Sequence, residues 1–263
     1  MKTSKLKQLA VAGLTALALT YGCTKPDLEK KQDLEKIALS ESSKNKVVMF
    51  GECHYKYGED NDFVSRILPQ LKEQGFKYLA LEIKRTLLGS NPAHKAISDY
   101  IKGKIKRKDI NPDNYGIGLL DLEECATGWL EMINEAKSLG FNIICYDAGG
   151  YSSFNEREEK SFKNLKEMIF NKDPDAKVII YCGNRHINEK EAYDPELVKW
   201  EEQQNLENRS EDGKFKCLAY HLSDYTKGKT LTILLTGYDR YITYCDITLD
   251  LDKNECLKNN PKK

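Results

Sequence analysis

The sequence of 263 residues has no excess of either charge, because 41 Lys and Arg residues balance 41 Asp and Glu residues. Proteins that bind nucleic acid usually carry a basic stripe or patch, so this balance argues against that class of partner. No internal apolar run reaches the roughly 20 residues that a membrane-spanning helix needs. The hydrophobic content of 40% is nevertheless too high for a disordered chain. We therefore expect one domain of ordinary size.

The sequence also lacks a C-x-x-C pair, which argues against a zinc ribbon. Three of the eight cysteines lie in apolar, strand-like runs, where a thiol behaves as a small hydrophobic side chain: Cys145, Cys182 and Cys245. One disulfide that involves Cys125, Cys217 or Cys256 stays open as an alternative in an oxidising compartment.

The N-terminus resembles a bacterial lipoprotein signal peptide. Three lysines among the first seven residues precede an apolar stretch of 12 residues from Leu9 to Thr20, and Gly22-Cys23 follows. The pattern predicts cleavage before Cys23 and attachment of lipid to that cysteine, which would anchor the protein to a membrane of the bacterial cell envelope, outside the cytoplasm. Residues 1–22 are then a signal peptide and no part of the fold. A plain secretory peptide and a retained anchor are the alternatives.

The rest of the chain divides into a charged tether (23–45), a single α/β domain (46–252) and a polar tail (253–263). Residues 46–50 predict a short buried strand. A unit of helix, Gly-Phe, strand and carboxylate then occurs twice, ending at Glu82 and at Asp147, and a looser copy ends at Gly183. Strands that alternate with helices of this length indicate a mostly parallel sheet flanked by helices.

The C-terminal part of the domain has a different pattern. Residues 230–235 and 241–249 predict two strands, and the turn-forming residues 237–240 between them predict a hairpin. We therefore expect the sheet to be mixed at one edge. The polar residues 188–214 predict a surface insertion or a lid over a site.

Ionisable side chains follow four consecutive predicted strands. Glu52 and His54 follow the first strand, Glu82 the second, Asp147 the third, and Arg185 and His186 the fourth. The carboxyl ends of parallel strands share one edge of a sheet, and ligands bind there. Both histidines belong to G-x-x-H motifs. We therefore expect Glu52, His54, Glu82 and His186 to form a site, with Asp147 either a fifth member or a turn cap.

This set of residues suits two kinds of chemistry. Two imidazoles and two carboxylates can hold a divalent metal, such as manganese, cobalt, zinc or iron, which activates a water molecule. Without a metal, one histidine acts as a general base that a carboxylate orients, and Arg185 stabilises an oxyanion. The plainer alternative is that these side chains only cap neighbouring loops.

Other residues give weaker signals. Cys53 is a poor candidate for a nucleophile, because alternation along an extended segment turns it away from His54. We expect His221 to lie on a helix as a packed or half-exposed side chain rather than as a ligand, and His94 to face solvent from a loop. The basic run from Lys102 to Lys108 predicts a solvated loop, with contact to anionic lipid as the alternative.

Residues 47–54, 79–82 and 183–187 resemble the motifs of the EreA/ChaN-like superfamily. This superfamily includes erythromycin esterases, the haem-binding lipoprotein ChaN and the TraB/Tiki metalloproteases. The resemblance spans residues 46–250 and implies the superfamily's α/β fold, with Glu52, His54, Glu82 and His186 lining the site. In the Tiki-like branch these residues would bind a metal such as manganese. In the esterase-like branch His54 would activate water beside Glu82.

We therefore expect a lipid-anchored, hydrolase-like protein that activates water against an ester or amide, in a small molecule or a peptide. The alternative is a haem- or metal-binding lipoprotein of ChaN type without turnover, so whether the protein is an enzyme stays open. Residues 85–120 and 188–214 would select the substrate.

Overall fold

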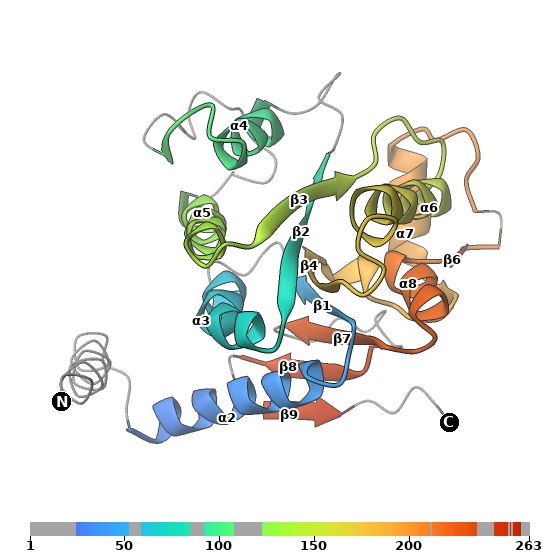
Figure 1. Cartoon of the computed structure of the whole chain (residues 1–263). Coiled ribbons are helices and arrows are strands. Elements are labelled where there is room, and N and C mark those ends of the chain that lie inside the picture. The colour runs from blue at the N-terminus through green and yellow to red at the C-terminus, as the bar shows by residue number, and fades with distance from the viewer. Residues whose placement is uncertain are drawn as a thin grey trace, which may run out of the picture.

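The chain has an α/β fold in which one sheet is covered by helices on both faces (Figure 1). The structure is a computed structural model that describes residues 25–52, 59–84, 92–107, 123–210, 212–235, 245–251, 253 and 255–258. Its seven-stranded sheet has the order β3-β2-β4-β1-β7-β8-β9, and only the pair β8·β9 is antiparallel. The expected class, a mostly parallel but mixed sheet flanked by helices, is confirmed.

The central strands read as continuous apolar runs because both of their faces are covered. The strands are β1 (Val47–Glu52), β2 (Phe76–Lys84), β3 (Asn142–Asp147), β4 (Lys177–Gly183), β7 (Thr230–Leu235), β8 (Ile247–Asp250) and β9 (Glu255–Lys258). Every residue of β1 and β7 is buried. A separate two-stranded sheet pairs β5 (Ala192–Tyr193) with β6 (Lys214–Phe215).

Two groups of helices cover the two faces of the sheet. The first face carries α2 (Lys25–Ser42), α3 (Glu59–Glu73), α4 (Pro92–Ile101) and α5 (Glu123–Ser138). The second carries α6 (Phe154–Leu165), the π-helical turn η3 (Lys166–Phe170) and α8 (Leu218–Thr226), with α7 (Pro195–Gln203) beside α6. A single 3₁₀ turn, η4 (Asn184–His186), follows β4 directly.

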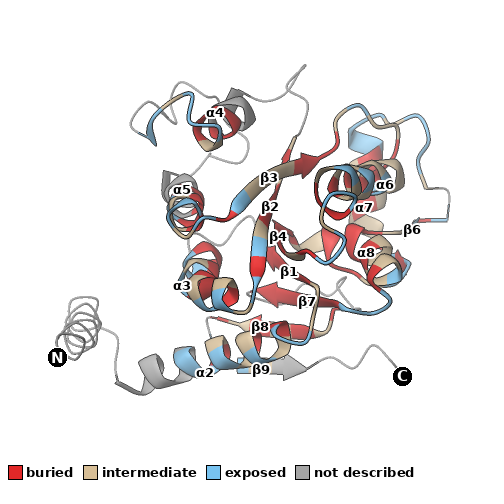
Figure 2. Cartoon of the chain, viewed as in Figure 1, coloured by how far each residue is buried: buried red, intermediate tan, exposed pale blue. Residues whose placement is uncertain are grey.

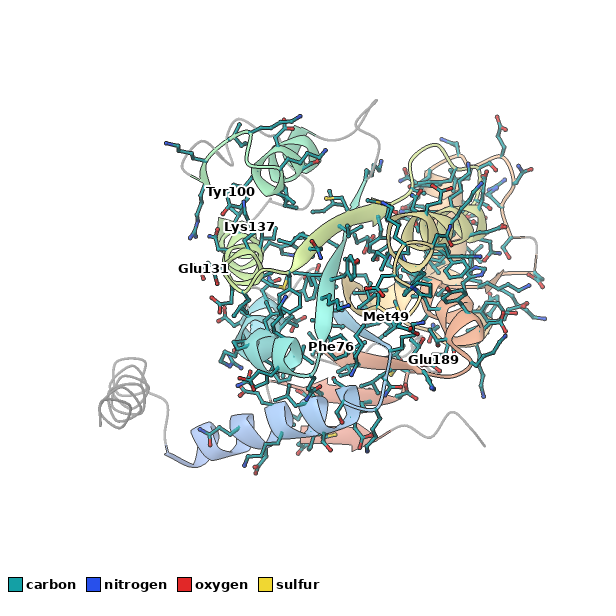
Figure 3. The ribbon with its side chains drawn as sticks, in the orientation of Figure 1. Met49, Phe76, Tyr100, Glu131, Lys137 and Glu189 are labelled. Carbon is teal, nitrogen blue, oxygen red and sulfur yellow. The ribbon has the colours of Figure 1, made fainter. Side chains whose placement is uncertain are left out.

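Figure 2 shows buried residues along the central strands β1 and β7. Alternation along the strands divides the buried residues between two cores. On β1, Val48 and Phe50 face the α3·α5 side, whereas Val47 and Met49 face the α6·α8 side. At the margin of the first core, α4 lies against α5, where the ammonium group of Lys137 is 4.2 Å from the ring centre of Tyr100 (Figure 3). Each strand-end side chain therefore reaches one helical layer or the other.

The repeated unit of helix, Gly-Phe and strand is present as α3–β2 and α5–β3. The predicted hairpin is wrong, because β8 runs parallel to β7, with Ile233 opposite Ile247. Turn-forming residues at 237–240 indicate a break between strands but not the direction in which the chain re-enters the sheet. The antiparallel edge comes instead from β9, which pairs with β8 inside the segment expected to be a polar tail.

The segment expected to be a tether forms α2, and its described part packs on the domain. Leu34 and Ala38 are buried in the first core, and Glu35 pairs with Arg66 of α3 at 2.7 Å. Among the helices that the structure describes, none is long and apolar enough to cross a bilayer.

Candidate active site

Four neighbouring strands bring polar side chains to one edge of the sheet. In spatial order these strands are β3, β2, β4 and β1. Asp147, Glu82 and Glu52 lie near the carboxyl ends of β3, β2 and β1, and β4 ends at Gly183, from which η4 leads to His186. The backbone N–H of Gly183 donates to Glu82 Oε2 at 2.7 Å. This bond ties the carboxylate of β2 to the exit of β4, from which the chain turns into η4.

His186, at the end of η4, lies between two carboxylates. Its Nε2 is 3.0 Å from Glu82 Oε1, and its Nδ1 is 2.7 Å from Glu158 Oε2. The imidazole is 7% exposed. Burial alone would lower the pKa of His186, but the charges of Glu158 and Glu82 and their hydrogen bonds outweigh burial and raise this pKa to about 10. The ring is therefore an imidazolium at neutral pH.

Arg157 of α6 joins the carboxylates of β2 and β3. Its Nε and Nη2 each donate to Asp147 at 2.9 Å, a two-point contact, and Nη2 also donates to Glu82 Oε1 at 2.6 Å. Burial would lower the pKa of Arg157, but Asp147 and Glu82 raise it well above its usual value. The group Glu82, Asp147, Arg157, Glu158 and His186, called the strand-end cluster below, combines three carboxylates with two cations. It has a formal charge of −1.

Helix α6 supplies two consecutive members of this cluster. Its N-cap Ser153 accepts a hydrogen bond from the backbone N–H of Glu156 at 3.1 Å, which fixes the start of the helix. Arg157 and Glu158 follow within the first turns and are 13% and 1% exposed. The rotation of α6 set by its cap therefore directs both side chains to the strand ends.

Aromatic side chains surround the cluster on the α6 side. The ring of Phe154 stacks on His186 with centres 5.6 Å apart, and Phe215 and Trp200 meet Phe154 edge to face. Tyr151 lies over the guanidinium of Arg157 at 5.7 Å and stacks on Trp200. Trp200 lies within residues 188–214, and Phe215 directly follows them. The expected insertion therefore packs against the aromatic side chains that surround the strand-end cluster.

Glu52 is not part of the strand-end cluster. It shares the β1 face of Val48 and Phe50, so its carboxylate meets the other helical layer, where Trp129 Nε1 donates to it at 3.3 Å and the Tyr181 hydroxyl also donates. Glu82 lies between Leu81 and Ile83, which both face that layer, and so points the opposite way. The sequence pattern predicted that both carboxylates lie at one edge of the sheet, but it did not indicate that they lie on opposite faces.

Some of the other residues predicted for the site contact one another, and others do not. Glu82 and His186 are in contact, and Asp147 joins them through Arg157. Arg185 pairs with Asp194, the N-cap of α7, at 2.6 Å and shows no contact with the cluster. Five residues lie wholly or in their side chains outside the described part of the chain: Cys23, Cys53, His54, His94 and Cys125. For His94 the backbone is described, and it belongs to α4 rather than to a loop.

The weaker candidates also have definite positions. His221 is a half-buried residue of α8, as expected, with its ring stacked on Phe162 of α6, and burial lowers its pKa. No disulfide joins any two of the five cysteines that the structure describes, which are Cys145, Cys182, Cys217, Cys245 and Cys256. Of these, Cys182 and Cys245 are buried as small hydrophobic side chains, as expected. Residues 102–107 are mostly exposed.

Arg157 and Glu158 are the members that sequence reasoning missed. They lie in the run Asn-Glu-Arg-Glu-Glu-Lys, whose charges suggest a solvated helix face. The signal that points to them is position, because this helix starts shortly after the strand-end Asp147. A helix that follows such a strand begins at the edge where ligands bind.

The described residues do not make up a metal site. They contain no group of three or more His, Cys, Asp or Glu side chains that could hold an ion. Glu82 is bonded to a guanidinium, and both ring nitrogens of His186 face carboxylates, whereas a histidine ligand must present a neutral nitrogen. Glu52 faces the other side of the sheet. The described residues of this edge therefore do not fit a divalent metal.

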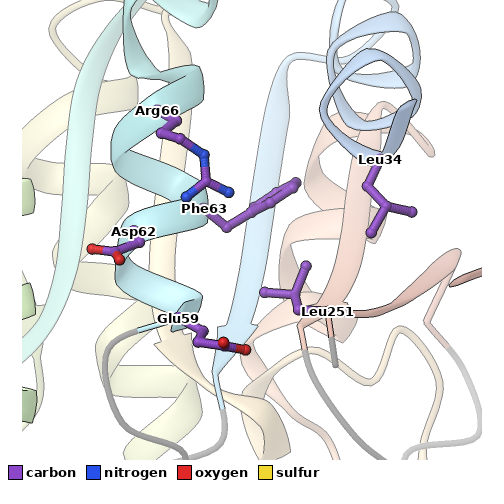
Figure 4. A pocket seen from close by; sticks show the side chains of 6 residues that line it. All are labelled: Leu34, Glu59, Asp62, Phe63, Arg66 and Leu251. Carbon is purple, nitrogen blue, oxygen red and sulfur yellow. The ribbon is translucent and has the colours of Figure 1, made fainter. Parts of the chain in front are cut away.

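A small cavity of about 70 Å³ lies away from the strand-end cluster, between α2 and α3 (Figure 4). The side chains of Leu34, Phe63 and Leu251 line it together with charged residues of α3. It belongs to the helical layer on the Glu52 side and has no contact with Glu82 or His186.

Neither a scan of protein-family models nor a search of curated proteins finds a match. Several solved structures are similar at low identity. A chain described as bacterial protein toxins is 13% identical with a TM-score of 0.46, over 94% of this chain and 43% of its own. RRSP, a MARTX toxin effector domain from Vibrio vulnificus, is 17% identical with a TM-score of 0.40, over 69% and 37%. The present chain thus spans about two-fifths of the toxin chains' length.

ChaN of Campylobacter jejuni, whose structure is described as showing cofacial haem binding, is also similar. It is 12% identical with a TM-score of 0.41, over 81% of this chain and 90% of its own. A protein from Bacillus cereus is 12% identical with a TM-score of 0.43.

Proposed function

We propose that the chain is a hydrolase-like protein in which Glu82 and His186 act together on water and on an ester or amide. The observation that carries this proposal is the 3.0 Å contact between an imidazolium Nε2 and a carboxylate oxygen at the carboxyl end of the sheet. The pair offers a proton acceptor and a proton donor side by side, which is the requirement for general acid–base catalysis.

These two side chains account for every proton transfer in the hydrolysis. Glu82 takes a proton from water as the water oxygen bonds to the substrate carbonyl carbon. His186 gives its Nε2 proton to the leaving oxygen or nitrogen as the bond from that atom to the carbonyl carbon breaks. The proton on Glu82 then returns to His186 across their contact. Arg157 holds Glu82 in place, and the aromatic rings around His186 exclude water from its face.

The test is hydrolysis of a panel of chromogenic esters and peptide amides by the protein without residues 1–22. We expect turnover by the native sequence and a loss of about 100-fold or more in Glu82→Gln, the scale of acid–base catalysis. His221→Gln is the control, because the ring of His221 stacks on Phe162 of α6 and is not a member of the strand-end cluster. Turnover that Glu82→Gln retains would reject the proposal.

Elemental analysis and haem titration of the same sample separate the alternatives. A Soret band that saturates at a fixed haem stoichiometry, with no hydrolysis of any substrate, would favour the haem-carrier alternative. About one divalent metal per chain, lost in a His54→Ala/His186→Ala variant, would favour the metal-dependent alternative, with His54 supplying a ligand from outside the described residues.

We also propose that the chain belongs to the EreA/ChaN-like superfamily and is a lipoprotein of the bacterial cell envelope. Support for membership comes from the motifs around Glu52, Glu82 and His186, and support for the anchor comes from the residues up to Cys23. The expected result is a membrane-bound, lipid-modified chain that Cys23→Ser releases. A chain whose membrane fraction is unchanged by Cys23→Ser would contradict the anchor.

A further inference from the structure

Glu158 bonds to a site side chain and to a helix end with the same oxygen. Its Oε2 accepts from His186 Nδ1 at 2.7 Å and from the backbone N–H of Leu218 at 2.8 Å. Leu218 is the first residue of α8, and the N-cap residue Cys217 makes no side-chain capping bond. Glu158 therefore satisfies an N-terminal amide of α8 from a different helix, as a capping side chain normally does from its own.

The same contact determines which nitrogen of His186 faces Glu82. Rotation of an imidazole about its bond to Cβ has a broad energy profile, so packing and hydrogen bonds decide its angle. With Nδ1 held by Glu158, Nε2 points to Glu82 Oε1. Phe154 stacks on one face of the ring but supplies no partner for either nitrogen.

We propose that Glu158 is a positioning residue, which fixes the orientation of His186 and couples that orientation to the first turn of α8. The effect on turnover rests on the proposed function, whereas the orientation of the ring does not. A displacement of the first turn of α8 would thus move the carboxylate that holds Nδ1 and change the contact between Nε2 and Glu82.

The chain contains a matched control for this role. Glu201 of α7 is 1% exposed, as Glu158 is, and likewise accepts from backbone amides, those of Phe154 at 2.6 Å and Ser210 at 2.9 Å. Its hydrogen bonds within the described part of the chain go to backbone groups only. Glu201→Gln therefore measures what loss of a buried, amide-bound carboxylate costs the fold, without a change at a hydrogen-bond partner of His186.

The experiment records the ring Nδ1–H signal of His186 by NMR in protein labelled with ¹⁵N-histidine, with a His186→Gln spectrum for assignment. Hydrogen exchange at Leu218 is followed in the same samples. We expect a slowly exchanging Nδ1 proton in the native sequence and in Glu201→Gln. In Glu158→Gln we expect that proton to exchange at least about 10-fold faster, together with faster exchange at Leu218.

Two results would overturn the positioning role. An unchanged Nδ1 proton in Glu158→Gln with faster exchange at Leu218 would make Glu158 a cap for α8 only. Equal effects in both Gln variants would show general loosening of the fold. Where a substrate is found, kcat should fall about 10- to 100-fold in Glu158→Gln with KM nearly unchanged. An NMR effect without hydrolysis by the native sequence would support the positioning role and reject the proposed function alone.

Discussion

The charge of His186 makes the stability of the fold depend on pH. Its pKa is raised from 6.5 to about 10 because the carboxylates of Glu158 and Glu82 outweigh burial. The protonated ring therefore stabilises the folded state fully below pH 6.5, and this contribution is lost as the pH rises toward 10. We predict that the free energy of unfolding of the native sequence exceeds that of His186→Gln by an amount that shrinks between pH 6.5 and 10.

His221→Gln is the control for this pH dependence. Burial lowers the pKa of His221, so its ring is neutral above pH 7 in the folded and unfolded chain. Its effect on the free energy of unfolding, measured by urea titration, should be constant from pH 7 to 10. A constant difference for His186→Gln over the same range would contradict the charged state of His186.

Arg157 is expected to stabilise the fold through the two carboxylates that it joins. Removal of one partner from a buried ion pair leaves unpaired charge and costs about 3–5 kcal/mol. We predict a loss of this size in the free energy of unfolding of Arg157→Met. Arg66→Met should cost less than about 1 kcal/mol, because its pair with Glu35 is at the surface. Equal losses in the two variants would show that Arg157 does not join buried charges.

Arg185 has a different role from the one that its place beside His186 suggested. It pairs with the N-cap carboxylate of α7, so Arg185→Met should destabilise α7 rather than impair chemistry. We predict faster hydrogen exchange in α7 with kcat within about 3-fold of the native value. A loss of kcat on the scale of Glu82→Gln, with native exchange in α7, would restore Arg185 as an oxyanion-stabilising group.

Strand β1 and the turn that carries His186 pack closely together at Gly51. A Cβ at Gly51 would lie 2.8 Å from Ile187 Cδ1 and 3.1 Å from Asn184 Cα. Only a residue without a side chain therefore lets η4 sit against the end of β1. We predict that Gly51→Ala costs about 1–3 kcal/mol by overpacking and shifts the NMR signals of His186.

Ile187→Val removes the methyl group of the closest contact and should restore part of the stability in the double variant. A Gly51→Ala chain as stable as the native one, with unchanged His186 signals, would show that β1 does not determine the position of η4. Both variants are compared by urea titration at the same pH.

The sequence specifies the strands and helices well because their patterns are local. The helix, Gly-Phe and strand unit predicted α3–β2 and α5–β3 and placed Glu82 and Asp147 at one sheet edge. The direction of β8 was not predictable from turn residues, because pairing depends on how a connection of several residues returns. The site was predicted only in part. A carboxylate at a strand end can face either helical layer, as Glu52 and Glu82 do, and the charged run that contains Arg157 and Glu158 has the pattern of a solvated helix face.

At the scale of the whole molecule, the sheet separates two polar environments at its carboxyl edge. Glu52 is held by Trp129 and Tyr181 on the α5 side, whereas the strand-end cluster lies against α6 and α8. Glu52 therefore lies on the opposite face of the sheet from Glu82 and His186, the two side chains to which we assign the proton transfers. A protein that uses this edge for hydrolysis requires the cluster on the α6 side to be intact.

The central claim is most directly tested by kcat/KM of His186→Gln against His221→Gln, on an ester or amide that the native sequence hydrolyses. Both variants replace a ring that stacks on a phenylalanine, but only His186 lies beside Glu82. The account predicts a loss of about 100-fold or more for His186→Gln and a change within about 3-fold for His221→Gln. Equal, small effects of the two variants would contradict it.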